Sequence, residues 1–479
     1  MKRFAGLILV FVMLLAALPA LADTTRTSGD FRYTLKSNGT ATIVGYTGSG
    51  DSIIIPQMLD GYTVTAIGDS AFKHQYSFGK NYSSVTLPDT IKSIGEFAFW
   101  NTNITSINLP DGLEDIGKGA FVGCNSITYR MSANHPTFAV IEGALYNKSQ
   151  KKLIWGKEGA KIPEGIKIIG DYACYEVPNC GINENGIVLP STIEEIGDYA
   201  FYGNIYSIEY SRALSLFRTT VPKSNYPYLD LKVDPAKLIW GSNLQKIGSY
   251  AFANITIKTG FSALILPIPS SVSEIGVGCF SEFGVQGYQH TNVVILIPKD
   301  SRLRSIPTKA FFNHLGTPAI CLIICEAPIV TIGDYAFYGT DIASFNMQNV
   351  KTLGKGTFME TTQRSGITIP ACLKIIPKDA FNNARTLGHD IVISNGVEVI
   401  EANALNVNLT KNSTHSKNEV YPLSPIRLPA SLTSIAPDAF RDDAEFIVER
   451  GSYAYRWAEE NARNYSIDGE KQNLDWLNN

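Results

Sequence analysis

The sequence predicts a repeat solenoid of short parallel strands, and two observations carry this prediction. The octapeptide IGDYAFYG occurs at residues 196–203 and again, letter for letter, at residues 332–339. Its core pattern, I-G-x-x-A-F, recurs in thirteen copies or near-copies, most of them 21 to 31 residues apart. One unit of this size cannot bury its own apolar side chains, so we expect the units to stack around a continuous core. The copies begin at Ile67, Ile94, Ile116, Ile169, Ile196, Ile247, Ile275, Ile306, Ile332, Leu353, Ile376, Ile400 and Ile435.

Two intervals in this series are about twice the usual spacing, at 53 and 51 residues, so each is expected to hide a degenerate copy. Residues 141–145 (IEGAL) are predicted to be the first hidden copy, and a stretch between Tyr206 and Asp234 the second. About fifteen units are therefore expected from Val64 to Phe440, with neighbouring strands about 4.8 Å apart.

Each unit is predicted to contain a short strand, a turn and a packing corner. The strand is an alternating apolar run that ends in Leu-Pro or Ile-Pro, as in VTLPDTIKSIG at residues 85–95. Proline ends the strand ladder because it has no N–H group. The glycine of I-G is expected to allow a backbone turn that other residues resist. The Ala-Phe pair places a small residue beside a large one, so we expect Phe to fill the space between coils.

The pattern of an apolar strand, L-P, and x-x-L-x-x-I-G-x-x-A-F resembles the BspA-like class of bacterial leucine-rich repeats, over about residues 30–468. Residues 138–147 (FAVIEGALYN) resemble a variant unit of that class, and residues 451–468 its closing segment. The resemblance implies a right-handed stack of short parallel strands, mostly β and coil, with turns or short helical segments on the convex side. It also implies adhesion to host matrix or plasma proteins, other microbes or glycans.

The expected domain organisation begins with a secretory signal peptide at residues 1–22. Its features are a basic start, an apolar run and the small-residue site Ala-Leu-Ala. An N-terminal β cap is expected at 23–62, the repeat array at 63–442, and a C-terminal cap and tail at 443–479. Inserts are expected near 204–235, 281–292 and 406–421. No lipid-anchor cysteine, wall-sorting motif or second apolar span is evident, so we expect a secreted or cell-surface protein.

The composition disfavours several classes of function. A net charge of −3 without a basic patch gives no sign of a nucleic-acid partner. Seven cysteines are too few for a disulfide framework, although Cys174 and Cys180 lie close enough in sequence to leave their pairing open. The six histidines are isolated in different units, and no nucleophile elbow or metal motif is present. We therefore predict a protein that is not an enzyme and holds no cofactor or metal.

The predicted ligand-binding residues come from a column about eight residues before the Ile of each unit, where side chains should point away from the core. The column is polar at both ends, for example at Thr86 and Arg427, and apolar over five central units. Three explanations stay open: cover by the insert near 204–235, an exposed patch that docks a partner, or the preference of strands for β-branched residues. The five apolar positions are Val188, Ile239, Ile265, Leu296 and Ile324.

A second set of candidates lies in the aromatic insert, because Tyr commonly anchors interfaces. It consists of Tyr206, Tyr210, Tyr226 and Tyr228. The sequence thus predicts an exported, non-enzymatic repeat protein that binds an extracellular protein or glycan. A structural spacer, and a secreted hydrolase whose site is built from the inserts, remain the alternatives.

Overall fold

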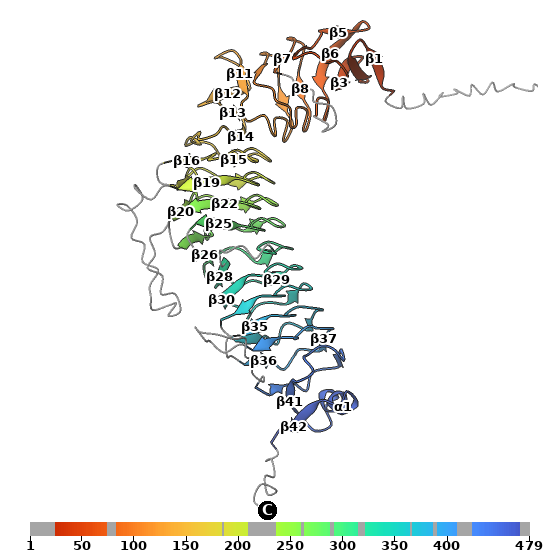
Figure 1. Cartoon of the computed structure of the whole chain (residues 1–479), viewed down its shortest axis with the longest axis vertical. Helices are drawn as coiled ribbons and strands as arrows, with labels where there is room; N and C mark the ends of the chain where they lie inside the picture. Colours follow the sequence, from red (N-terminus) through yellow and green to blue (C-terminus); the bar gives the residue numbers. More distant parts are fainter. Residues whose placement is uncertain are drawn as a thin grey trace, which may run out of the picture.

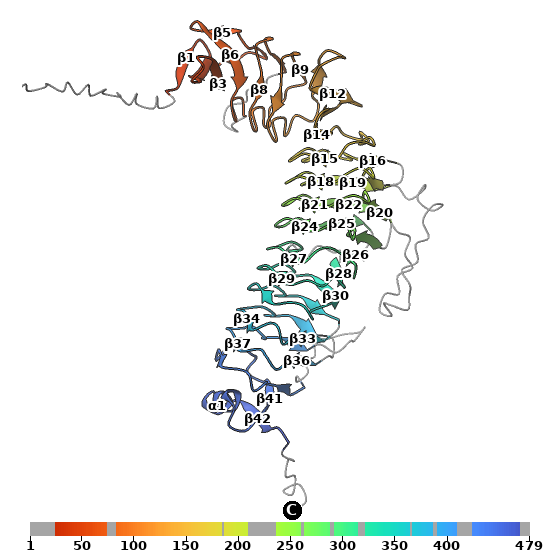
Figure 2. The ribbon, with the colours of Figure 1, turned by 180° about the vertical axis from the view of Figure 1, so that it is seen from behind.

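The chain folds into an elongated, bent stack of short strands, seen in a computed structural model (Figures 1 and 2). The predicted repeat solenoid is confirmed, because the described elements are strands apart from one helix. The structure describes residues 24–73, 83–183, 186–208, 236–259, 263–287, 292–314, 321–364, 366–386, 390–409 and 424–469.

The N-terminal cap is an antiparallel sheet that passes directly into the first parallel ladder. β1, β2 and β3 pair antiparallel, and β3 then pairs in parallel with β6. Tyr33 is fully buried there, and its hydroxyl donates to Asp60 Oδ2 at 2.8 Å. The sheet contains β1 (Arg26–Ser28), β2 (Phe31–Leu35), β3 (Ala41–Tyr46), β5 (Met58–Leu59), β6 (Tyr62–Ile67), β8 (Ser93–Ile94) and β10 (Asp115–Ile116).

Two further sheets complete the first half of the array. One contains β4 (Ser52–Ile54), β7 (Ser84–Thr86), β9 (Ser106–Asn108) and β11 (Thr128–Arg130). The other contains β12 (Phe138–Ile141), β13 (Ala144–Asn147), β14 (Lys152–Trp155), β15 (Ile168–Ile169), β18 (Glu195–Ile196), β21 (Lys246–Ile247) and β24 (Glu274–Ile275).

The longest sheet has ten strands and runs along the central part of the stack. It contains β16 (Ile182–Asn183), β17 (Gly186–Val188), β20 (Ala236–Ile239), β23 (Ala263–Pro267), β26 (Asn292–Ile297), β28 (Cys321–Cys325), β30 (Asp341–Phe345), β32 (Thr362–Gln363), β35 (Arg385–Thr386) and β38 (Asn408–Leu409). A three-stranded sheet accompanies it, with β19 (Ile205–Ile208), β22 (Thr256–Thr259) and β25 (Gly284–Gly287).

Short ladders continue to the C-terminal cap. Two are formed by the I-G strands: β27 (Ser305–Ile306), β29 (Thr331–Ile332) and β31 (Thr352–Leu353), then β34 (Ile375–Ile376), β37 (Val399–Ile400) and β40 (Ser434–Ile435). The others are β33 (Ile367–Ile369) with β36 (Ile391–Ile393), and β39 (Ile426–Arg427) with β41 (Glu445–Val448) and β42 (Asn464–Ile467). Helix α1 (Tyr453–Glu460) is capped by Ser452, whose side chain accepts from the N–H of Tyr455.

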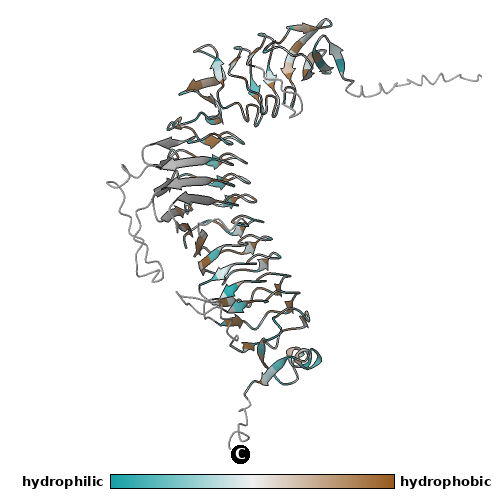
Figure 3. Ribbon diagram, in the orientation of Figure 1, coloured by the Kyte–Doolittle hydropathy of each residue, from teal (hydrophilic) through white to brown (hydrophobic). Residues whose placement is uncertain are grey.

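The core is continuous along the array because most units insert the Phe of the repeat corner between their neighbours. Apolar segments accordingly recur along the whole stack (Figure 3). Successive ring centroids lie 5.0 to 5.6 Å apart with nearly parallel planes, in the series Phe252, Phe280, Phe311, Phe337, Phe358 and Phe381. The predicted role of this Phe is confirmed.

The glycine of the I-G pair has a different role from the one predicted. Gly117 has no left-handed φ, but a Cβ there would lie 2.6 Å from the backbone nitrogen of Glu96 in the preceding coil. The glycine is therefore needed for the close approach of coils, not for a turn. The left-handed residue comes two positions later, as at Tyr199 and Tyr335, both with φ 54°.

Residues 141–145 do not form a hidden repeat unit, so this prediction was wrong. Glu142 and Gly143 both have positive φ, at 51° and 82°, which is the backbone of a two-residue hairpin turn. β12 and β13 consequently pair antiparallel, and β13 pairs antiparallel with β14 before the parallel ladder resumes at β15. The second predicted hidden copy falls mostly on residues 209–235, outside the described residues, as does the predicted signal peptide.

In the part of the chain that the structure describes, no helix is both long and apolar enough to span a bilayer.

Cys174 and Cys180, whose pairing the sequence left open, form a disulfide within one unit. Cys124, Cys279 and Cys325 are buried and free, which agrees with a role as small apolar side chains.

Candidate functional site

The predicted outward direction of the strand column is confirmed where the structure describes it. In β33 and β36 the central residues, Thr368 and Val392, are exposed, while the flanking isoleucines are buried. The polar residues near the two ends of the array, Thr86 and Arg427, are exposed as well. The column therefore lies on the outer face of the sheet along the array.

The two described residues of the apolar centre, Ile324 and Leu296, are covered to different degrees. Ile324 is only 2% exposed, and Val294 and Leu322 are similarly buried; together they form a small apolar cluster separate from the main core. Leu296 is half-buried and packs against this cluster. An apolar partner could reach this face at Leu296, whereas Ile324 is not accessible in this arrangement.

The other predicted ligand-binding residues lie outside what the structure describes. The side chains of Val188, Ile239, Ile265 and Tyr206 fall in this group, as do Tyr210, Tyr226 and Tyr228 entirely. Their assignment to ligand binding stays a prediction.

The backbone register corrects the column at one position. Ile265 pairs with Val294, whereas Pro267 is the residue that pairs with Leu296. β23 ends at Pro267, and a second proline, Pro269, lies two residues later. The Ile-Pro pair that aligns with the other units is Ile268-Pro269, not Leu266-Pro267. Ile265 therefore lies two residues away from the column along β23.

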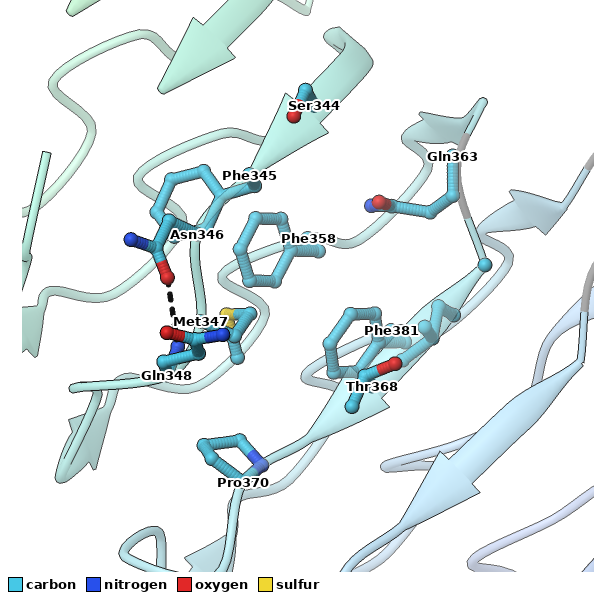
Figure 4. A pocket seen from close by; sticks show the side chains of 12 residues that line it. Ser344, Phe345, Asn346, Met347, Gln348, Phe358, Gln363, Thr368, Pro370 and Phe381 are labelled. Atoms are coloured by element: carbon cyan, nitrogen blue, oxygen red, sulfur yellow. Dashed lines mark hydrogen bonds between the residues drawn. The ribbon is translucent and has the colours of Figure 1, made fainter. Parts of the chain in front are cut away.

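A slot that the sequence did not predict opens between β30 and β33, next to this column (Figure 4). It is a cavity of about 480 Å³ that extends from the outer face of the sheet to the Phe core. None of the described residues that line it is charged. They are Ser344, Phe345, Asn346, Met347, Gln348, Phe358, Gln363, Gly366, Ile367, Thr368, Pro370 and Phe381.

The slot exists because the sheet splits at this point. β30 pairs with β28 up to Phe345, but with β32 only at Asp341 and Ile342. Among the described strands, β33 pairs only with β36. The carboxyl-terminal half of β30 and the whole of β33 therefore face each other without pairing.

Pro370 follows β33, in the place of the proline that ends the strand in most units, and it offers no N–H across this gap. In adjacent units the residue at this position donates its N–H to the previous strand: Asn346 to the carbonyl of Cys325 at 2.8 Å, and Ser394 to that of Ile369 at 3.0 Å. The equivalent acceptor here is the Phe345 carbonyl, and proline has no N–H to offer it. The nearest sequence signal is the spacing of 21 residues between Ile332 and Leu353, which is the shortest in the array and contains β30.

The floor of the slot is aromatic and its rim is neutral and polar. Phe358 lies 5.5 Å from Phe345 and 5.0 Å from Phe381 between ring centroids. On the rim, Asn346 Oδ1 accepts the backbone N–H of Gln348 at 3.2 Å (Figure 4). Aromatic rings beside a few amide and hydroxyl groups are a lining typical of ligand pockets.

A half-buried ion pair lies at the start of β30, close to the slot. Arg364 donates from Nε and Nη2 to Asp341 Oδ2 at 3.1 and 2.6 Å. Burial raises the pKa of the Asp341 carboxyl, and the Arg364 guanidinium opposes this rise. The side chain of Asp341 is 10% exposed, so the charge depends on Arg364.

The described residues contain no group of three or more side chains placed to hold a metal ion.

A second aromatic feature, the stack of Tyr172, Tyr199 and Tyr250, has centroid distances of 4.9 and 5.0 Å and joins successive corners. Because these rings pack on one another, we assign them to the repeat architecture rather than to a site.

Comparison with known proteins agrees with this architecture. A family model described as "BspA type Leucine rich repeat region (6 copies)" matches residues 46–154, 157–283, 219–314 and 286–414. These matches cover well over half of the chain. No curated protein matches it.

Several solved structures are similar. A leucine rich cell surface protein from Faecalibacterium prausnitzii A2-165 is 22% identical, covering 76% of this chain and 95% of its own, with a TM-score of 0.31. A leucine-rich repeat protein from Bacteroides ovatus is 17% identical, covering 92% and 99%, with a TM-score of 0.38. The pneumococcal vaccine antigen PcpA is 14% identical, covering 94% and 99%, with a TM-score of 0.30.

Proposed function

The chain belongs to the family of BspA-type leucine-rich repeat proteins, and from this premise we propose that it is an exported, non-enzymatic protein that binds extracellular macromolecules. A stack of this kind presents a long, rigid outer face, which suits the binding of an extended protein or glycan surface. The ligand classes are host matrix and plasma proteins, other cells and glycans, and the role is adhesion or host interaction. The protein acts after export, either secreted or at the cell surface.

One observation carries this proposal: the outer column is apolar in the centre of the array and polar at its ends. Leu296 is a described residue where this apolar face reaches solvent, beside the buried Ile324. Apolar groups that are placed on an outer face, among polar ones, mark interaction sites. The predicted residues Val188, Ile239 and Ile265 would extend the face toward the N-terminus, and the insert tyrosines would flank it.

The test is binding of residues 23–479 to immobilised plasma proteins, matrix proteins and a glycan array. We expect one class to retain the chain, and Leu296→Asp to weaken that binding at least tenfold because the carboxylate must be desolvated. Thr86→Asp, at the exposed end of the same column, is the matched control and should bind normally. Ile324→Asp is unsuitable because Ile324 is buried, so a loss of binding would not be distinguishable from unfolding.

Binding that is equal for wild type and Leu296→Asp would exclude the outer column as the site. Retention by none of the three ligand classes would favour the spacer role instead. A variant that lacks residues 209–235 separates the contribution of the insert, provided that its thermal unfolding matches that of the intact chain.

A further inference from the structure

Both walls of the slot present backbone hydrogen-bonding groups that none of the described strands uses. On β30, the N–H of Asn346 points to β28, since it donates to the Cys325 carbonyl. Backbone groups alternate in direction along a strand, so the N–H and C=O of Phe345 point into the slot. Among the described strands, none pairs with Phe345 on that side.

The opposite wall is β33, whose backbone groups also alternate in direction. On β33, the N–H of Ile367 donates to the Asp390 carbonyl at 3.2 Å, and the Ile369 carbonyl accepts from Ser394. These two residues therefore face β36, and the N–H and C=O of Thr368 between them face the slot. Two strand edges thus oppose each other across one cavity.

We propose that this slot binds an extended, uncharged peptide segment of a partner protein, which adds a strand beside β30 and fills the gap in the sheet. The proposal rests on the proposed function and names the chemistry of one ligand. An unpaired strand edge is a template for a further strand, with main-chain hydrogen bonds supplying affinity and side-chain pockets supplying specificity. Here the edges supply the Phe345 and Thr368 backbone groups.

The aromatic floor adds side-chain selectivity. Successive side chains of an extended peptide point to opposite faces, so one would enter the slot while its neighbours remain on the rim. The floor side chains Phe358 and Phe381 are 2% and 3% exposed, which makes a dry contact for an aliphatic or aromatic residue. The described lining residues carry no charge, so a charged residue would lose water without gaining a partner among them.

A glycan fits this floor less well. A sugar ring packs on the face of an aromatic ring, and both faces of Phe358 are already covered. Phe337 and Phe381 lie 5.3 and 5.0 Å from it with interplanar angles of 3° and 16°. The floor therefore offers ring edges, which accept an aliphatic or aromatic side chain more readily than a sugar.

The experiment selects a random heptapeptide display library on the wild-type chain and, in parallel, on the variants T368P and T368V. The enrichment of each peptide is compared between the three proteins. T368P removes the N–H that faces the slot and leaves the hydrogen bonds between β33 and β36 in place. T368V keeps that N–H and replaces only the hydroxyl by a methyl group. We expect enriched peptides to be uncharged, rich in strand-forming residues and to contain one large apolar residue. They should bind T368P about tenfold more weakly than T368V, which changes the side chain at the same position but keeps the N–H.

A second measurement needs no variant. Copies of the enriched peptides with N-methylated central amides should lose binding to the wild-type chain, because they cannot donate to a strand edge. Equal enrichment on T368P and wild type, or equal binding of the N-methylated copies, would overturn the proposal. So would a wild-type chain that dimerises through the slot while T368P stays monomeric, since a second copy would then be the occupant. Retention of the chain by matrix or plasma proteins in any of these cases would leave the proposed function standing.

Discussion

The ring of Tyr335 lies over the backbone of Gly356 in the next unit, so that a Cβ at Gly356 would overlap the ring carbon Cε1. Gly356 has φ +59°, and the same arrangement joins Phe97 to Gly119 and Tyr250 to Gly278. An aromatic residue in the left-handed region therefore packs on a glycine one unit further along. This contact explains why the position two after I-G is either aromatic or glycine in these units.

Gly356→Ala is consequently expected to destabilise the protein by about 2–3 kcal/mol, from left-handed strain plus displacement of the Tyr335 ring. Gly61→Ala is the matched control, because Gly61 has φ +83° but nothing within 4 Å of its Cβ position. It should cost only about 1 kcal/mol. Denaturant midpoints measure both, and equal losses would show that the ring contact contributes nothing.

The sequence predicted the repeated parts of the fold and missed the parts that depend on pairing between units. The corner Phe, seen at Phe337 and Phe358, was predictable because it has the same role in successive units. The hairpin at Gly143 was missed because I-E-G-A-L fits the repeat pattern, while two consecutive left-handed residues decide the turn. The slot was missed because it lies beside a register shift in the pairing of β28 with β30, between Ile323 and Ile324, which no sequence pattern marks.

The loss of Arg364 is expected to lower the free energy of unfolding more than the loss of one partner of an exposed ion pair would. Arg364→Ala leaves the buried Asp341 carboxylate without a counter-charge, at a cost of about 3 kcal/mol. The double variant D341N/R364A removes the charge as well and should recover most of this loss. Thermal unfolding of the four proteins completes the cycle. If the double variant is no more stable than R364A alone, charge burial is not the cause.

The same carboxyl predicts a pH dependence of stability. The pKa of Asp341 is raised by burial above its ordinary value of 3.8, despite Arg364. The folded state therefore holds this proton more tightly than the unfolded state, so the contribution is present below pH 3.8 and is lost as pH rises through the folded pKa. Relative to D341N, wild type should lose stability with rising pH in the window just above pH 3.8. Denaturant midpoints across that window measure the difference, and parallel curves for the two proteins would contradict the assignment.

The Cys174–Cys180 disulfide is expected to contribute to stability although its loop is short. The two residues are six apart, so their cross-link removes loop entropy from the unfolded chain worth about 2 kcal/mol. The double variant C174A/C180A should unfold at a correspondingly lower denaturant concentration, and a reducing agent should lower the midpoint of wild type but not of this variant. A midpoint of wild type that does not respond to reduction would contradict the prediction.

The buried free cysteines should resist alkylation until the chain unfolds. Burial raises the pKa of Cys124 to about 11 and that of Cys325 to about 12, so few thiolates form at about pH 8. Cys372 is partly exposed and should be alkylated first by iodoacetamide. Mass spectrometry of the labelled peptides follows each site separately, before and after addition of denaturant. Labelling of Cys124 or Cys325 at the rate of Cys372 in the native protein would show that the stack opens locally at those units.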